Sequence, residues 1–376
     1  MNEIDDTYRP VAKIVVIGVG GAGNNAVNRM IDEGLKDVEF YVANTDRQTL
    51  NSSKTKNRLI LGYGITGGLG AGGEPSVGRE AANDSIEDIR QVVKGANMVF
   101  IAAGMGGGTG TGAAPIIAQV AKEENALVVA IVTRPFTFEG KKRIAHSVEG
   151  LNELKDAVDA IIIVSNDKLL MLSGTQSILS AFAESDAVLA QSVKTVTDLI
   201  LMPAIINLDF ADVRNTLKDA GISLIGFGFG EGPSRAHDAA QNAINSPLLE
   251  ASINGARRAI CSVTCGPNVS LFEAQEAVNL VIEAAGSNID VKFGVAINRE
   301  LSDQILVSVI ASDFTEEFDF TSVPDYGKEI QKMKTSGEKN SLPTPKEDTN
   351  TKQVSDEQEK QEDSILPGFL RGKNVT

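Results

Sequence analysis

The chain has 376 residues, 42% of them hydrophobic, which is enough for two domains that each bury a core. Its formal net charge of −15 argues against a nucleic-acid-binding protein, which would normally present a basic face. The sequence has no apolar run of bilayer length and no secretory signal, and its two cysteines cannot form a disulfide framework, so we expect a cytoplasmic protein without direct membrane insertion.

The first half of the chain alternates short β-branched runs with helical patterns. Strands are predicted at residues 11–19, 39–45, 98–103, 127–133 and 160–166, and helices at residues 24–34, 85–95, 113–125 and 143–157. The strands are apolar along their length, which is typical of a parallel sheet covered by helices on both faces. We therefore predict an α/β domain at residues 11–175, preceded by a flexible N-terminus at residues 1–10.

A long helical pattern without glycine or proline follows at residues 176–202, and we predict that this helix connects two domains. The α/β pattern then restarts, with helices at residues 211–221, 234–244 and 270–286 and strands at residues 223–229, 257–265, 290–298 and 304–312. Because the last two strands follow each other without a helix, residues 203–315 are predicted to form a second α/β domain with a mixed sheet.

The composition changes beyond residue 315. Residues 327–364 contain no aromatic side chain, so the segment 316–363 cannot bury enough apolar surface to offset its ordering entropy and is predicted to be a disordered linker. Apolar side chains return in "ILPGFL" at residues 365–370, which predicts a docking peptide at residues 364–376. The alternative is a frayed terminus without a function.

Two glycine-rich turns follow predicted strands. The first, "GVGGAGNN" at residues 18–25, matches the G-x-G-x-x-G fingerprint of dinucleotide-binding folds, and Glu39 lies near the expected position of the ribose acid. Taken alone, this turn makes an NAD-dependent oxidoreductase an alternative.

The second turn, "GMGGGTGTG" at residues 104–112, has six glycines in nine positions and runs into a predicted helix. Backbone N–H groups at a helix start, with the hydroxyls of Thr109 and Thr111, suit an anion such as phosphate. No lysine follows, so this is not the Walker loop. A tight turn with incidental glycines is the alternative.

Together with "FADV" and "NTD", the second turn resembles the signature of the FtsZ family, the tubulin-like GTPases of bacterial cell division, over roughly residues 11–314 and the terminal peptide. The resemblance implies a Rossmann-like, parallel-sheet GTP-binding domain, a long central helix, a second α/β domain with a mixed sheet that activates hydrolysis, and a disordered tail. It also implies GTP or GDP as ligand, with Mg²⁺ bridging the phosphates. An oxidoreductase would leave the second turn unexplained.

The resemblance assigns site residues one by one. The phosphates would be held by Gly20, Gly21, Ala22, Gly23, Asn24, Asn25, Gly104, Gly106, Gly107, Gly108, Thr109, Gly110, Thr111 and Gly112, with Ala71, Gly72 and Gly73 by the γ-phosphate. Further nucleotide contacts would come from Asn44, Asp46, Thr133 and Pro135, from Glu139 at the ribose, from Arg143 at the phosphates, and from Asn166, Phe182 and Asp186 at the base.

Asp186 is the residue that would select guanine. Its carboxylate can accept from the two donors of guanine, N1 and N2, whereas adenine offers no such pair. The family usually places an Asn and an Asp together here, but this chain has Ala187 after Asp186, so the amide is missing.

Hydrolysis needs a water molecule oriented at the γ-phosphate, and "NLDFADV" at residues 207–213 offers carboxylates for it. Asp209 and Asp212 are three residues apart at a predicted helix start and can point the same way. Alternatively, each carboxylate only stabilises the helix N-terminus. The resemblance implies that Asn207, Asp209 and Asp212 enter the pocket of the next subunit, so that GTP is hydrolysed only in a head-to-tail filament, a contact that does not close. There they would polarise water and help to hold the cation, but no residue is assigned to a metal site of its own subunit.

The resemblance also implies partners and a location. The chain would assemble with itself, and membrane-anchoring and regulatory division proteins would bind Ile365, Leu366, Pro367, Phe369, Leu370 and Arg371 at the mid-cell ring. An adaptor that binds GTP without hydrolysing it is the remaining alternative, and the aspartates of residues 207–213 argue against it.

Overall fold

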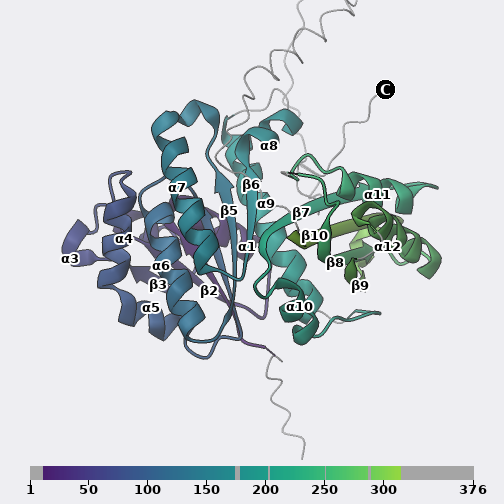
Figure 1. Ribbon diagram of the computed structural model, residues 1–376, viewed down its shortest axis with the longest axis horizontal. Helices are drawn as coiled ribbons and strands as arrows, with labels where there is room; N and C mark the ends of the chain where they lie inside the picture. The colour runs from purple at the N-terminus through teal and green to yellow at the C-terminus, as the bar shows by residue number, and fades with distance from the viewer. Residues whose placement is uncertain (1–11, 174–177, 202–203, 250, 287–288, 315–376) are drawn as a thin grey trace, which may run out of the picture.

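The computed structural model describes residues 12–173, 178–201, 204–249, 251–286 and 289–314 (Figure 1). Its first strands are β1 (Ile14–Val19), β2 (Glu39–Asn44), β3 (Arg58–Ile60), β4 (Met98–Gly104), β5 (Leu127–Arg134) and β6 (Ala160–Ser165). The accompanying helices are α1 (Gly20–Asp32), α2 (Arg47–Asn51), α3 (Tyr63–Thr66), α4 (Pro75–Asp84), α5 (Ile86–Val93), α6 (Thr109–Glu123), the 3₁₀ turn η1 (Thr137–Glu139), α7 (Lys141–Ala157) and α8 (Asn166–Ser173).

The long helix α9 (Ile178–Leu201) leads into the rest of the chain. There follow α10 (Phe210–Leu217), β7 (Gly221–Gly230), α11 (Arg235–Ile244), β8 (Ala256–Cys265), α12 (Leu271–Ala285), β9 (Asp290–Ile297), the 3₁₀ turn η2 (Arg299–Leu301) and β10 (Ile305–Phe314).

All strands described here join one sheet of ten strands in the order β3-β2-β1-β4-β5-β6-β7-β10-β8-β9. Strands β1 to β7 run parallel, whereas β10 is antiparallel to β7 and β8, and β9 is parallel to β8. The mixed sheet of the second half is therefore confirmed, as is the parallel sheet of the first half.

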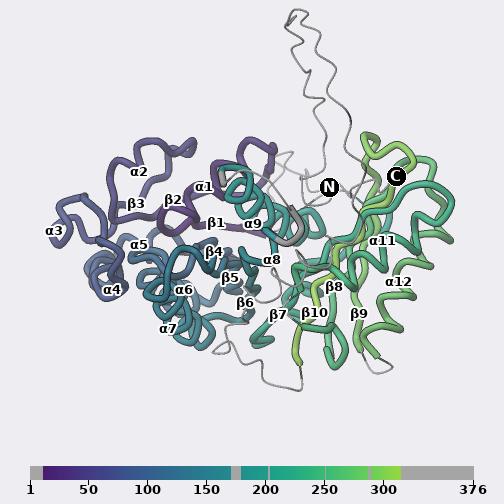
Figure 2. Tube along the Cα trace, turned by 90° about the horizontal axis from the view of Figure 1, so that it is seen from above, coloured from purple at the N-terminus to yellow at the C-terminus, as the bar shows by residue number. Residues whose placement is uncertain are grey.

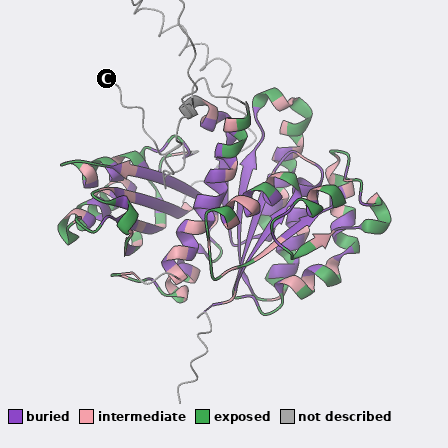
Figure 3. Cartoon of the chain, turned by 180° about the vertical axis from the view of Figure 1, so that it is seen from behind, coloured by how far each residue is buried: buried purple, intermediate pink, exposed green. Residues whose placement is uncertain are grey.

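Helices cover both faces of the sheet, and Figure 2 shows α1 and α9 on one side of the first strands and α6 and α7 on the other. The alternation along β4 explains this arrangement, because Phe100 belongs to the core beneath α1 and α9 while Ile101 belongs to the core beneath α4 to α7. Both residues are fully buried. Because both faces of β4 are buried, its sequence is apolar at every position rather than at alternate positions. Figure 3 shows the buried strands and the exposed outer sides of the helices.

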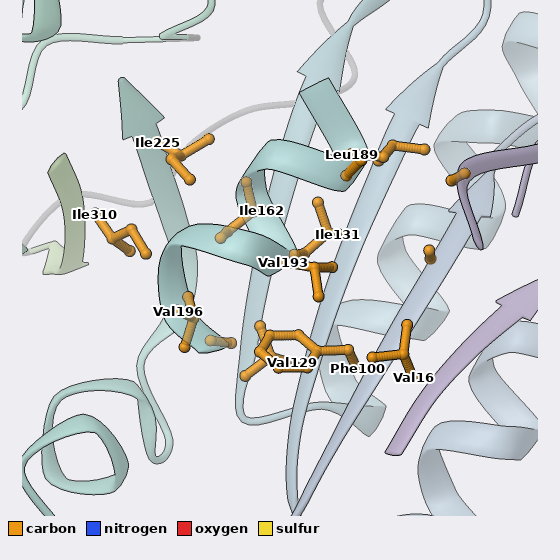
Figure 4. Close-up of a cluster of buried hydrophobic side chains, with 14 of the residues drawn as sticks. Val16, Phe100, Val129, Ile131, Ile162, Leu189, Val193, Val196, Ile225 and Ile310 are labelled. Atoms are coloured by element: carbon orange, nitrogen blue, oxygen red, sulfur yellow. The ribbon is translucent and has the colours of Figure 1, made fainter. Parts of the chain in front are cut away.

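The largest core surrounds α9 and joins the two halves of the chain. Leu189, Val193 and Val196 of α9 pack among side chains of the first strands, such as Val16, and of the last strand, such as Ile310 (Figure 4). We expected a separate core in each domain. The second half does have clusters of its own under α11 and α12, but the core around α9 is shared.

Several short elements were missed by the sequence reading, namely β3, α2, α3, α4 and α8. The predicted N-terminus at residues 1–10, linker at residues 316–363 and docking peptide at residues 364–376 lie outside the described residues. None of the helices in the described part of the chain combines the length and apolar character needed to cross a membrane.

Candidate functional site

The two glycine-rich turns lie side by side because their strands are neighbours. β1 and β4 pair in parallel up to Val19 and Ala103, so the turns that follow them meet at the carboxyl edge of the sheet. The chain continues from β1 to β2 and β3 on one side of this pair and from β4 to β5 and β6 on the other. Ligands of parallel α/β sheets bind at such a reversal of strand order.

A cavity of about 430 Å³ lies at this edge of the sheet. It is lined by Gly20, Gly21, Ala22, Asn25, Gly104, Met105, Gly107, Gly108, Thr109, Gly110, Thr133, Pro135, Glu139, Arg143, Asn166, Phe182 and Asp186. All of these except Met105 are residues that the sequence analysis had assigned to a nucleotide. Met105 is buried against Gly150 of α7, a contact that no sequence pattern indicated.

The other assigned residues do not line this cavity; they are Gly23, Asn24, Asn44, Asp46, Ala71, Gly72, Gly73, Gly106, Thr111 and Gly112. Some of them support its walls. Gly23 lies against the carbonyl of Ala102, and the Thr111 hydroxyl accepts a hydrogen bond of 2.8 Å from the Gly106 N–H. Gly72 and Gly73 are exposed.

Many of the glycines are required by packing between backbone segments. A Cβ on Gly110 would lie 2.6 Å from the carbonyl oxygen of Gly104, and one on Gly104 would lie 2.7 Å from the Cβ of Ala22. Gly21 and Gly107 differ, because each lines the cavity and has open space where a Cβ would be. The glycine content of the second turn thus has two causes, contact between the turns and room for a ligand.

The cavity has the donors that an anion needs. The helices α1 and α6 begin at Gly20 and Thr109, so the unpaired N–H groups of two helix N-termini lie at its wall. Thr109 adds a hydroxyl, and Arg143 adds a guanidinium. This end of the cavity can bind phosphate groups through backbone and side-chain donors despite the acidic composition of the chain.

The part of the lining that comes from α8 and α9 combines an aromatic ring with buried polar groups. Phe182 packs edge-on against Phe136, with ring centroids 5.0 Å apart. Asn166 is buried, and its Oδ1 accepts a hydrogen bond of 2.8 Å from the Ser185 hydroxyl, which joins the end of β6 to α9. This combination suits a planar ring with polar edges.

Asp186 lies on α9 near Phe182 and has a perturbed acidity. Burial raises the pKa of its carboxyl from the ordinary 3.8 to about 7, against the opposing effect of the positive charge of Arg29 on α1. A carboxylate whose hydration is reduced by burial is stabilised by any ligand that donates to it. Donors of a ligand would restore the charged form.

Glu139 and Arg143 form an ion pair at the mouth of the cavity. The Glu139 Oε1 also accepts a hydrogen bond of 2.9 Å from the Phe136 N–H, so the carboxylate is held by the loop in which it lies. Its side chain is 12% exposed, whereas that of Arg143 is 57% exposed. Arg143 is therefore the more mobile partner and can turn toward an anion.

Asn44 and Asp46 organise the loop after β2. The Asn44 Oδ1 accepts from the Asp46 N–H at 3.2 Å, and the Asp46 carboxylate caps α2 by accepting from the Gln48 N–H at 2.8 Å. The hydroxyl of Thr49 also donates to Asp46, and this bond is the main reason why the pKa of Asp46 is lowered.

Asn207, Asp209 and Asp212 lie outside the cavity, the first two in the segment between α9 and α10 and Asp212 in the first turn of α10. Asn207 and Asp209 are exposed. The Asp209 carboxylate caps α10 by accepting from the Asp212 N–H at 2.8 Å, so Asp209 stabilises the N-terminus of that helix. Asn207 accepts from the Ala204 N–H at 2.8 Å.

No three His, Cys, Asp or Glu side chains of residues 12–173, 178–201, 204–249, 251–286 and 289–314 are grouped so that they could hold a metal ion. Magnesium usually keeps several water ligands and binds through one or two carboxylates together with phosphates of the substrate. The carboxylates and anion donors around the cavity are compatible with that kind of binding.

The family model described as the GTPase domain of the Tubulin/FtsZ family matches residues 13–174, and the model of the C-terminal domain of the FtsZ family matches residues 221–315. An empty dimer of FtsZ from M. jannaschii is similar at 37% identity and a TM-score of 0.78, over 84% of this chain and 95% of that one. A mutant of the same FtsZ is similar at 38% identity and a TM-score of 0.79, over 82% and 93% of the two chains. CetZ2 from Haloferax volcanii, at 21% identity and a TM-score of 0.70 over 86% of this chain and 99% of that one, shares the fold.

Proposed function

Since this chain belongs to the tubulin/FtsZ family of GTPases, we propose that it assembles head to tail into filaments of a bacterial division ring and completes each GTP site with residues of the next subunit. One observation carries the proposal. The cavity has phosphate donors and base contacts, but Asn207, Asp209 and Asp212 all lie outside it.

GTP would bind with its phosphates at the starts of α1 and α6 and its base against Phe182. Asp186 would accept from guanine N1 and N2, and Glu139 would accept from the ribose hydroxyls. Thr133, Pro135 and Asn166 would complete the wall around the ribose and base. Because adenine presents an acceptor at N1, the carboxylate selects against ATP.

The exposed loop that begins at Asn207 would enter the cavity of a neighbouring subunit. Asp212 would orient the attacking water there, since the Asp209 carboxylate is already engaged by the helix that it caps. Asn207 and Asp209 would fix the loop and help to hold the cation. Mg²⁺, bound mainly by phosphate and water oxygens, would neutralise charge during phosphoryl transfer.

The remaining assignments are proposals of the same kind. Asn44 and Asp46, with residues 71–73, would close over the phosphate end once nucleotide is bound. Residues 11–175 would form the GTP-binding domain and residues 203–315 the activation domain. The docking peptide at residues 364–376 would bind membrane-anchoring division proteins, with residues 316–363 as its tether. Its removal should abolish recruitment to the division site and leave GTP hydrolysis nearly intact.

A mixing experiment tests whether the site is shared between subunits. Asp212→Ala leaves the cavity of its own subunit intact, and Arg143→Ala damages the cavity but leaves the loop intact. Each variant alone should bind or hydrolyse GTP poorly, whereas a mixture should regain activity, because the cavity of the first meets the loop of the second. GTP hydrolysis is measured against total protein concentration with light scattering recorded alongside.

Asp238→Ala, an exposed aspartate on α11, serves as the control and should behave like the wild type. Wild-type activity per molecule should rise above a concentration threshold. Activity of the mixture equal to the sum of the separate variants would contradict the shared site. Activity per molecule that stays constant on dilution would contradict assembly-dependent hydrolysis.

A further inference from the structure

Two threonine hydroxyls form a buried pair at the phosphate end of the cavity. The Oγ1 atoms of Thr45 and Thr109 lie 2.7 Å apart, and either of them can be the donor. Thr45 has no exposed surface, and Thr109 is 8% exposed. Thr109 lines the cavity, whereas Thr45 lies behind it and does not.

The geometry points to Thr45 as a positioning residue for phosphate: we infer that its hydroxyl donates to Thr109 and thereby directs the Thr109 proton at an anion in the cavity. The inference rests on the proposed placement of the nucleotide phosphates at the start of α6. It adds a residue that touches no ligand and yet sets the direction of a hydrogen bond to it.

The direction of the hydrogen bond follows from the number of protons available. Each hydroxyl has a single proton, so one of the two must donate within the pair and the other keeps its proton free. An anion at Thr109 can only accept, and it therefore stabilises the arrangement in which Thr45 donates to Thr109 and Thr109 donates to the ligand. In such a chain each hydrogen bond polarises the next one and strengthens it.

The backbone of Thr45 is held firmly enough for this role. Its carbonyl oxygen accepts from the Gly70 N–H at 3.1 Å, and the Thr66 hydroxyl lies 3.3 Å from the same oxygen and 3.2 Å from the carbonyl oxygen of Gly62. Thr109 is the first residue of α6, and α4 packs closely against its backbone, since a Cβ on Gly78 would lie 3.1 Å from the Thr109 Cα. Both threonines are therefore held by packed elements.

Thr45→Val keeps the shape of the side chain and removes the hydroxyl. We expect its affinity for GDP to fall about threefold to tenfold, which is the range for the loss of one hydrogen bond. Its affinity for guanosine, which has no phosphate, should not change. Thr45→Ser retains the hydroxyl and should bind GDP like the wild type.

The measurement is displacement of a fluorescent GDP analogue by GDP and by guanosine, with thermal unfolding recorded for every variant. Thr197→Val on α9 is the matched control, since Thr197 is 1% exposed and its hydroxyl donates to the Val193 carbonyl, away from the cavity. In a Thr109→Val background, Thr45→Val should have no further effect on GDP affinity, because the residue through which it acts is gone.

Unchanged GDP affinity in Thr45→Val, or an equal loss for GDP and guanosine, would overturn the inference. A wild type that binds neither ligand would overturn the proposed function itself. If Thr45→Val does not fold, Thr45→Ala and Thr45→Ser provide the same comparison, because they differ only in the hydroxyl. Equal GDP affinity of these two variants would likewise overturn the inference.

Discussion

The raised pKa of Asp186 predicts that guanine nucleotide binding weakens as the pH falls through neutrality. Burial places the pKa of this carboxyl at about 7 in the free protein. Guanine donors require the ionised form, so binding and protonation compete for the same carboxylate. Because the folded-state pKa is raised, the protonated form accumulates below about pH 7 and the affinity is lost in that direction.

The expected magnitude follows from the ionised fraction of Asp186. With a pKa of about 7, this fraction is about nine tenths at pH 8, one half at pH 7 and one tenth at pH 6. If only the carboxylate binds, the apparent Kd for GDP rises about tenfold between pH 8 and pH 6. The assay is a titration of a fluorescent GDP analogue at a series of pH values and constant ionic strength.

Asp186→Asn is the control for other titrating groups. The variant should bind GDP more weakly at pH 8, by about ten- to a hundredfold, because hydrogen bonds to a charged group are lost. It should also lose the tenfold dependence attributed to Asp186. The terminal phosphate of GDP titrates near pH 6 as well, and any dependence that the variant retains comes from that phosphate or from other groups of the protein. Equal pH dependence in wild type and Asp186→Asn would refute the reasoning.

Three further predictions concern the turns, the helix cap and the thiols. Gly106→Ala should lower the free energy of unfolding by about 1–3 kcal/mol, because Gly106 has φ +98° and an added Cβ would lie 2.7 Å from the Arg143 carbonyl oxygen. Gly107→Ala has open space at its Cβ, so it should unfold like the wild type and change only the affinity for GDP. Chemical denaturation and GDP titration measure the two effects. Asp209→Ser should keep the cap of α10 and the stability of the protein but lose GTP hydrolysis. Asp209→Ala should lose GTP hydrolysis and also about 1 kcal/mol of stability. If Asp209→Ser is as stable and as active as the wild type, Asp209 acts only as a helix cap. Burial raises the pKa of Cys261 to about 12 and that of Cys265 to about 11, so neither thiol should react with iodoacetamide at pH 8 until the protein unfolds, and labelling of the native protein seen by mass spectrometry would contradict their burial.

The sequence predicted the long strands and helices of both halves because their apolar patterns are strong. It missed β3, which has only three residues, and α4, whose buried positions are Gly78, Ala81 and Ala82. Such small side chains give no apolar stripe that a helical period would reveal. Nor did it place β10 between β7 and β8, because strand order depends on contacts far apart along the chain.

For the site, too, the sequence indicated the residues but not the contacts between segments that are distant along the chain. The resemblance named sixteen residues that the structure brings to one cavity, but it gave no physical reason for the individual glycines. Gly104 and Gly110 turn out to be needed where the two turns touch each other. The pairing of Thr45 with Thr109 joins positions 64 residues apart, so no local pattern could have predicted it.

The helix α9 has a mechanical consequence for the proposed filament. Asp186 of α9 lies at the cavity, and the loop with Asn207 follows the end of α9 at Leu201, so the helix between the two spans about 22 Å at 1.5 Å per residue. Since apolar side chains from both halves of the chain enclose α9, it cannot bend or shorten without exposing them to water. In the proposed filament it would therefore act as a rigid spacer between the nucleotide that one subunit binds and the loop that the same subunit offers to its neighbour.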